Sequence, residues 1–246
     1  MTILILGASG QTGRLVVGQL LAQKISVHVV VRSTDDFHAL LPEHMSHINQ
    51  LVITEASISN LSEQELNELV SGCSTVISCL GHNMSFKGIY GQPRRLVTDS
   101  VKRICQSIKH TADNNVPVKF ILMNTTGNQN IKAGEEISVA QKITIWLIRQ
   151  LIPPHADNEA AAEYLQAHFS ESNENIEWSV VRPDSLIDKT DCSEYDIYPS
   201  PIRSAIFDAG ITSRINVAHF ITALVTDSAL WAQWKTKMPV IYNRVN

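Results

Sequence analysis

Short apolar runs recur along the chain and are separated by longer amphipathic segments. Several runs are apolar on successive residues, which is typical of parallel strands buried on both faces. The predicted strands are Thr2–Leu6, Val27–Val31, Ile48–Ile53, Thr75–Cys79, Val118–Met123, Trp178–Val181 and Val240–Tyr242. The predicted helices are Thr12–Lys24, Glu63–Ser71, Arg94–His110, Val139–Leu151, Asn158–Ser170 and Val217–Thr226. This alternation predicts an α/β fold with a doubly wound parallel sheet, formed as a single domain over residues 1–246.

The segment 184–212 interrupts the alternation with two prolines, two tyrosines and scattered polar residues. In a sheet whose strands end at a shared crevice, late irregular insertions commonly cover the ligand. We therefore expect a small C-terminal region that covers a substrate pocket. A plain surface loop explains the same composition equally well.

Composition narrows the classes of partner. A net charge of -4 and a pI near 6.1 do not favour a nucleic-acid or membrane surface. The four cysteines form no CxxC pair and no zinc-site spacing, so we expect no metal and mostly buried, reduced thiols, with a redox role as the alternative. No apolar run approaches the roughly 20 residues of a membrane span, and no signal peptide precedes the first strand. A cytoplasmic protein acting on a small molecule is expected, and its oligomeric state stays open.

The turn Gly7-Ala-Ser9-Gly10-Gln11-Thr12-Gly13 lies between the first predicted strand and the first predicted helix. In such a turn the first glycine permits a tight bend, and the second lets the backbone approach a pyrophosphate. The third glycine lets the helix pack close to the strand, with its N–H groups facing the phosphates. The context predicts a dinucleotide site, whereas a glycine triplet alone would also fit a purely structural turn.

The end of the second strand indicates which dinucleotide is bound. An NAD site places a carboxylate there for the ribose 2′-hydroxyl, and an NADP site places an arginine there for the 2′-phosphate. Here Arg32 is followed by the hydroxyl of Ser33, and Arg14 directly follows the third glycine. These residues favour NADP(H), although two solvated surface arginines would look the same. Asp35 and Asp36 are the main objection, because a shifted strand end would bring them closer.

The fourth predicted strand ends in Ser78-Cys79-Leu80-Gly81-His82-Asn83. The small residues of this stretch would let the backbone at Leu80–Gly81–His82 run beside the nicotinamide ribose. His82 is either a functional acid or a polar loop residue.

These landmarks together resemble the atypical short-chain dehydrogenase/reductase superfamily, in its NmrA-like and biliverdin- and flavin-reductase-like group. The matching stretches are GASGQTGR at 7–14, VVVRS at 29–33, VISCLGH at 76–82, FILMNTTG at 120–127 and WSVVRPDSLID at 178–188. The resemblance implies a Rossmann fold, a nicotinamide cofactor and a substrate pocket closed by the C-terminal region. It also implies that Thr125 holds the place of the serine that often follows the fifth strand, and that Ser57 replaces an aspartate that meets the adenine.

The main departure from that superfamily is the missing Tyr-x-x-x-Lys. The nearest match is Tyr164-Leu-Gln-Ala-His168, which has no lysine. In the stretch before it, Asp157 or Asn158 is a good helix N-cap, and the preceding prolines would fix the helix entry. The alternative is that His155 and Asn158 face the nicotinamide ribose, because a histidine exchanges a proton near neutral pH and an amide holds a hydroxyl.

Three functions fit this sequence, of which an epimerase or dehydratase is the least favoured because it also normally needs the missing tyrosine. The first is an NADPH-dependent oxidoreductase that acts on a small carbonyl, quinone, flavin or similar conjugated acceptor, with Thr125, His155 and Asn158 as candidate catalytic residues. The alternative is a non-catalytic NADP(H)-binding sensor or regulator of the NmrA-like type, because the usual acid–base pair is missing.

Overall fold

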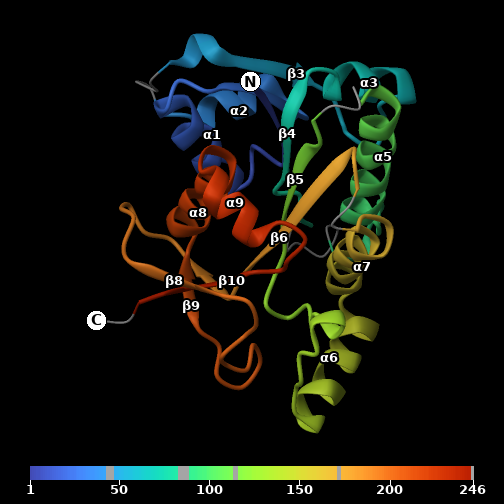
Figure 1. Ribbon diagram of the computed structural model, residues 1–246, viewed down its shortest axis with the longest axis vertical. Coiled ribbons are helices and arrows are strands. Elements are labelled where there is room, and N and C mark those ends of the chain that lie inside the picture. The colour runs from blue at the N-terminus through green and yellow to red at the C-terminus, as the bar shows by residue number, and fades with distance from the viewer. Residues whose placement is uncertain (43–46, 83–88, 113–115, 171–172, 245–246) are drawn as a thin grey trace.

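The computed structural model describes residues 1–42, 47–82, 89–112, 116–170 and 173–244, whose strands build one eight-stranded sheet (Figure 1). The strands follow the order β3-β2-β1-β4-β5-β6-β10-β8 across the sheet. Their bounds are β1 (Thr2–Leu6), β2 (Ser26–Val31), β3 (Leu51–Glu55), β4 (Cys73–Ser78), β5 (Val118–Met123), β6 (Ile176–Pro183), β8 (Tyr195–Tyr198) and β10 (Val240–Asn243). Neighbouring strands pair in parallel, except that β8 runs antiparallel to β10. The predicted α/β, Rossmann-like sheet is confirmed.

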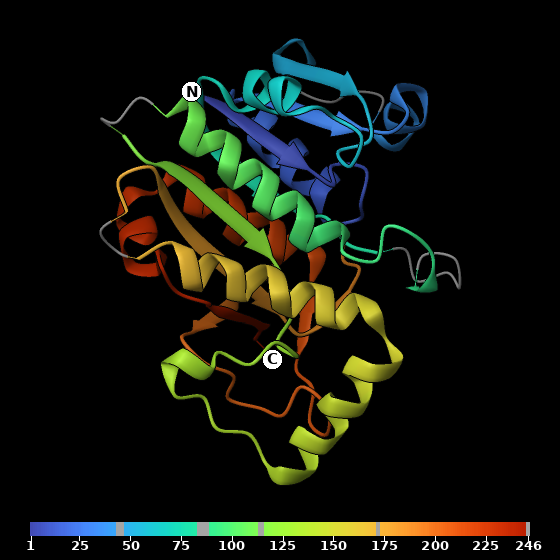
Figure 2. The ribbon, with the colours of Figure 1, turned by 90° about the vertical axis from the view of Figure 1, so that its right-hand side faces the viewer.

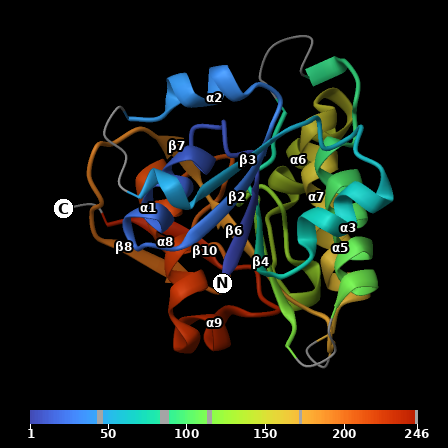
Figure 3. The same cartoon turned by 90° about the horizontal axis from the view of Figure 1, so that it is seen from above.

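Helices cover both faces of the sheet (Figure 3). On one face lie α1 (Gly13–Ala22), α8 (Arg214–Thr226) and α9 (Ser228–Trp234). On the other face lie α3 (Glu63–Val70), α5 (Leu96–Thr111) and α7 (Pro153–His168). Figure 2 shows α5 and α7 side by side, with α6 (Val139–Leu151) beyond the end of α7. The short α2 (Thr34–Leu40) connects β2 to β3.

The strands are apolar on successive residues because each strand feeds two separate cores. In β1, Leu4 and Leu6 pack into the cluster under α3, α5 and α7, whereas Ile3 and Ile5 pack into the cluster under α1 and α8. All four side chains are at most 1% exposed. A strand with helices on both faces has no solvent face, so it carries no polar alternation.

Several element bounds differ from the sequence prediction. β3 begins at Leu51, because Ile48–Gln50 forms a 3₁₀ turn (η1). Helix α7 begins at Pro153 and includes both prolines that were expected to precede it. The first turn of a helix leaves its N–H groups unpaired, so proline, which has no N–H, is well placed there. The helices α2 and α9 were not predicted; each has seven residues, too few to show a helical periodicity.

The segment 184–212 is more regular than its composition suggested. β7 (Ser185–Ile187) and β9 (Ile211–Ser213) pair in parallel to form a separate two-stranded sheet. Between them, β8 joins the edge of the main sheet beside β10. Within the described residues, no single helix is long and apolar enough to cross a membrane.

The cysteines differ in exposure. Cys73 and Cys105 are buried, Cys79 is partly buried and Cys192 is exposed. Burial raises the pKa of the Cys73 thiol to about 11. Such thiols stay protonated and unreactive near neutral pH.

Candidate functional site

The glycine turn closes against the end of β4. Gly7 has φ +75°, a conformation that residues with side chains rarely adopt, and a Cβ there would lie 2.5 Å from the carbonyl oxygen of Cys79. A Cβ at Gly13 would lie 2.2 Å from the carbonyl oxygen of Gly7. Neither position has room for a side chain, so the backbone of the turn can pack this closely only with glycine at both positions.

The turn presents N–H groups at the start of α1. Gly10 N–H donates to Gly7 O and Arg14 N–H donates to Gly10 O, each at 3.0 Å. Within the described residues, no backbone acceptor pairs with the N–H groups of Gln11, Thr12 and Gly13. Ser9, Gly10 and Gln11 are exposed. Unpaired N–H groups and the positive end of the helix dipole form a site for a phosphate.

The end of β2 places Arg32 as the first residue after the strand. Its side chain is exposed and Arg14 is half-buried, and neither takes part in an ion pair between described residues. Ser33 is the N-cap of α2, where its hydroxyl accepts from Asp36 N–H at 3.1 Å. Asp35 and Asp36 therefore belong to the first turn of α2 rather than to the strand end.

A carboxylate that the sequence reading missed lies at the same edge. Glu55, at the end of β3, is in register with Val31 and accepts the N–H of Thr34 at 2.8 Å. The hydrogen bond from the Thr34 backbone lowers the pKa of this exposed carboxyl group. Ser57 follows in the loop after β3 and is half-buried. Both arginines and Glu55 thus border the place where the adenosine end of a dinucleotide is expected.

His82, after β4, forms a buried pair with Asp157 of α7. The Nε2–Oδ2 distance is 2.8 Å, and the two side chains are 5% and 1% exposed. Asp157 also accepts the N–H groups of Val97 and Thr98 at 2.8 and 2.9 Å. Asp157 therefore caps α5, and the prediction that Asp157 or Asn158 caps its own helix is wrong. Leu80 and Gly81 precede His82 at this edge, and the neighbouring Asn83 lies outside the described residues.

The loop after β5 carries the hydroxyl of Thr125. Thr125 Oγ1 accepts the N–H of Gly127 at 3.2 Å. Asn124 Nδ2 donates to the carbonyl oxygen of Asn158 at 2.8 Å and so ties the loop to α7. A Cβ at Gly127 would lie 3.1 Å from His155 Cε1 and 3.7 Å from Thr125 Oγ1. The structure thus brings Thr125 and His155 together, whereas Asn158 is held through its backbone oxygen.

His155 belongs to an ionic cluster that sequence reasoning did not find. Its Nε2 lies 3.4 Å from Glu159 Oε1 on the next turn of α7. Arg149, near the end of α6, makes two hydrogen bonds to Glu159, Nε to Oε2 at 2.6 Å and Nη2 to Oε1 at 2.9 Å. The i, i+4 spacing of His155 and Glu159 was visible in the sequence, but the partner on α6 was not.

Tyr164, the nearest match to the family tyrosine, lies elsewhere. Its ring packs 4.3 Å from that of His168 and edge-on to Phe169, against the core under α5. Burial raises the pKa of its hydroxyl. Tyr164 therefore has a packing role that is separate from Thr125 and His155.

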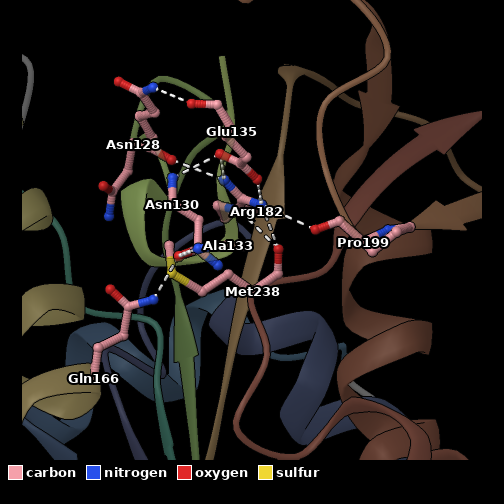
Figure 4. Close-up of polar contacts among 9 residues, drawn as sticks. Asn128, Asn130, Ala133, Glu135, Gln166, Arg182, Pro199 and Met238 are labelled. Atoms are coloured by element: carbon pink, nitrogen blue, oxygen red, sulfur yellow. Dashed lines mark hydrogen bonds and ion pairs between the residues drawn. The ribbon is translucent and has the colours of Figure 1, made fainter.

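Arg182, from the Arg-Pro of the matching motif, holds the loop after β5 in place (Figure 4). Its side chain is fully buried and contacts both carboxylate oxygens of Glu135, at 2.6 and 2.9 Å. It also donates to the carbonyl oxygens of Asn128 and Met238. A buried guanidinium with this many partners is satisfied, so its role is to fix the loop that carries Thr125.

Asp184, directly after β6, joins this loop to segment 184–212. It is buried and accepts the N–H groups of Gly210 and Ser185 at 2.8 and 2.9 Å. Burial raises the pKa of its carboxyl group and outweighs these hydrogen bonds.

The comparisons with known proteins agree with this geometry. The model of a family described as NAD(P)H-binding matches residues 7–228, so the chain belongs to that family. This is consistent with the resemblance to the atypical short-chain dehydrogenase/reductase superfamily. The chain matches none of the curated proteins with which its sequence was compared.

Solved structures share the fold at low sequence identity. An anaerobillin reductase, ChuY from Escherichia coli O157:H7, is 15% identical over 100% of this chain and 98% of its own, with a TM-score of 0.68. A short-chain dehydrogenase/reductase from Veillonella parvula DSM 2008, solved with NADP, is 17% identical over 98% of this chain and 94% of its own, with a TM-score of 0.67. The oxidoreductase ylbE from Lactococcus lactis is 16% identical over 99% and 91%, with a TM-score of 0.67. This similarity establishes the shared fold.

Proposed function

We propose that this protein is an NADPH-dependent oxidoreductase that reduces a small carbonyl, quinone, flavin or similar conjugated acceptor. The observation that carries the proposal is that the Thr125 and His155 side chains both lie beside Gly127, after β5. This is the same edge of the parallel sheet as the glycine turn after β1. A hydroxyl and an imidazole then stand where a reacting nicotinamide is expected.

The glycine turn fits a pyrophosphate. Side chains at Gly7 and Gly13 would collide with backbone, and the N–H groups of residues 11–13 have no backbone acceptor among the described residues. Ser9 and Gln11 flank these groups on the exposed side. The pyrophosphate would be held by these N–H groups, and the Leu80–Gly81–His82 backbone would run beside the nicotinamide ribose.

The residues expected to contact the adenosine end of the cofactor favour NADP(H) over NAD(H). Arg32 is exposed at the end of β2 and is free to pair with a 2′-phosphate, with Arg14 close to the same turn. A planar guanidinium binds a phosphate through two hydrogen bonds, whereas a carboxylate at this position would repel it. Ser57 would lie on the adenine side.

When bound, the reduced nicotinamide supplies a hydride to the acceptor. The chain's own residues would orient the acceptor and supply the accompanying proton. Thr125 would hold the acceptor oxygen through its hydroxyl, and His155 would give that oxygen a proton. Such proton transfer contributes about 10²- to 10⁴-fold to a rate.

Segment 184–212 would cover the acceptor. Asp184 ties its two ends together, and Ser204 Oγ donates to Gln141 Oε1 of α6 at 3.0 Å. Ile202 and Phe207 of this segment are 60% and 62% exposed. Exposed apolar side chains in a segment anchored at both ends suit a cover for a flat conjugated molecule.

The proposal is tested by mixing the protein with NADPH and a panel of quinones, flavins and carbonyl compounds in single turnovers. Loss of the near-ultraviolet absorbance of reduced nicotinamide is the expected result, and Thr125→Val should slow it. NADPH binding without turnover of any acceptor would contradict the reductase.

The preference for NADP(H) has its own test. Arg32→Glu should weaken NADPH by about 2–3 kcal/mol, roughly 30- to 150-fold, because it replaces a charge-assisted pair with a repulsion. NADH affinity should change little, and Lys109→Glu, in the last turn of α5, is the charge-reversal control. Equal affinities of the parent protein for NADPH and NADH, measured by calorimetry, would contradict the preference.

A non-catalytic NADP(H) sensor of the NmrA-like type is the second candidate. It is supported by the packing of Tyr164 away from the candidate site and by one face of α6. There Val139, Ile143, Trp146, Leu147 and Leu151 are 45–72% exposed. An apolar helix face of this extent suits contact with a partner protein.

A further inference from the structure

An ionic cluster at the junction of α6 and α7 includes His155. Glu159 is its centre, with a side chain only 8% exposed, and it receives Arg149 from one side and His155 from the other. Glu163, one turn further along α7, is exposed, and its negative charge interacts with the Arg149 guanidinium.

Glu159 stays ionised in this setting. Burial alone would raise the pKa of its carboxyl group, but the neighbouring His155 and Arg149 side chains outweigh burial and lower it. A buried carboxylate with a fixed cation on one side is a rigid acceptor for a neighbouring N–H. Arg149 thus keeps Glu159 charged and in place.

The imidazole of His155 has two different sides. Its Nε2 is fully buried, lies 3.4 Å from Glu159 Oε1 and makes no hydrogen bond among the described residues. Its Cε1 and Nδ1 lie toward Gly127, 3.1 and 3.7 Å from the position of a Cβ there. Nε2 therefore faces a buried carboxylate, whereas Nδ1 lies on the side where Thr125 stands.

We propose that Glu159 is a positioning residue that accepts the Nε2 proton of His155 and so turns Nδ1 toward the acceptor as the proton donor. The inference rests on the proposed reductase. The arrangement places a carboxylate behind the histidine, as in other active sites where an acidic residue orients the imidazole.

The proton step balances with NADPH as the reductant. The hydride carries two electrons to the acceptor carbon or nitrogen, and the Nδ1–H bond of His155 breaks as an O–H or N–H bond forms on the acceptor. His155 is left neutral with its remaining proton on Nε2, facing Glu159. A proton from solvent then restores the imidazolium.

The first readout needs no cofactor. In the full-length protein labelled with ¹⁵N-histidine, nitrogen NMR at mildly alkaline pH should show neutral His155 protonated on Nε2. Glu159→Gln should remove this preference, because an amide can donate to a ring nitrogen as well as accept from it. Glu163→Gln, an exposed carboxylate on the same helix, is the matched control and should leave the tautomer unchanged.

The second readout is kinetic. Glu159→Gln should lower kcat about 10- to 100-fold and leave KM for NADPH within about twofold, because Glu159 acts through His155 and not on the dinucleotide. In a His155→Gln background, Glu159→Gln should have no further effect on kcat. Glu159→Asp, which keeps the charge one methylene further away, should restore part of the rate and serves if Glu159→Gln does not fold.

The outcomes separate the two proposals. A wild-type tautomer and unchanged kcat in Glu159→Gln would overturn the positioning role and leave the reductase standing. Wild-type protein that binds NADPH but reduces no acceptor would overturn the reductase, and the positioning role with it. Loss of the Nε2 tautomer with a lowered kcat supports both.

Discussion

Helix α7 contributes to two histidine–carboxylate pairs that look alike and differ in what surrounds them. In the first, His82 meets Asp157 at 2.8 Å, and Asp157 also accepts two N–H groups of α5. In the second, His155 Nε2 lies 3.4 Å from Glu159 Oε1 and makes no hydrogen bond among the described residues, and Nδ1 lies toward Gly127. The first pair joins three elements, whereas the second leaves an imidazole edge beside Thr125.

The difference shows how to separate a structural pair from a reactive one. A buried polar group whose partners are all inside the fold contributes to stability, and removing one partner leaves the others unsatisfied. A group with one free nitrogen next to a hydroxyl is available to a substrate. The first pair should therefore affect mainly unfolding, and the second mainly turnover.

The largest expected effect is on stability. Asp157→Ala should destabilise the protein by about 3–5 kcal/mol, because it leaves His82 and the N-terminus of α5 without their buried acceptor. Urea unfolding measures the loss. Asp188→Ala, which removes an exposed carboxylate paired with Arg214, should cost less than about 1 kcal/mol. A loss below about 1 kcal/mol in Asp157→Ala would show that the first pair is not structural.

The second prediction compares the same substitution at the two histidines. His155→Gln should lower kcat about 100-fold and change the free energy of unfolding by less than about 1 kcal/mol. His82→Gln should do the reverse, costing about 1–3 kcal/mol of stability while kcat stays within about threefold. Steady-state kinetics and urea unfolding on both variants decide it. A fall in kcat in His82→Gln as large as in His155→Gln would remove the distinction.

The third prediction concerns pH. The folded-state pKa of Glu159 lies below the ordinary value of 4.5, so its stabilising contribution is fully present above that pH and is lost as pH falls through the folded value. The difference in unfolding free energy between wild type and Glu159→Gln should be larger at neutral pH than at about pH 3. The same difference at both pH values would show that the Glu159 carboxylate is not stabilised by its partners.

The smallest expected effect tests the space beside His155. Gly127→Ala places a Cβ 3.1 Å from His155 Cε1, so the ring must shift by a few tenths of an ångström. We expect kcat to fall about three- to tenfold with stability within about 1 kcal/mol, because small misplacements of a catalytic group are costly. An unchanged kcat in Gly127→Ala would place the reacting atoms away from His155.

The sheet and the phosphate-binding turn could be predicted from sequence because their causes are local. Residues of β1 alternate between two cores, which makes the run apolar throughout. Gly7 and Gly13 are set by a backbone conformation and a close approach within the same turn. A short stretch of sequence therefore contains the whole signal.

The candidate site could be predicted only in part, because its decisive contacts are distant in sequence. Asp157 looked like the cap of its own helix, but the N–H groups it caps lie 59 and 60 residues away on α5. Glu159 looked like an ordinary helical glutamate until Arg149 reached it from another helix. His155 and Thr125 were each named from sequence, and only the fold could bring them together.

The central claim is that the edge of the sheet joining the glycine turn to Thr125 and His155 carries out reduction with NADPH. The most direct measurement is a single turnover in which wild-type protein and His155→Gln, each saturated with NADPH, are mixed with the acceptor panel. We expect wild type to oxidise NADPH with at least one acceptor, and His155→Gln to bind NADPH equally well but to react about 100-fold more slowly. NADPH binding without oxidation in wild type, or equal rates in both proteins, would contradict it.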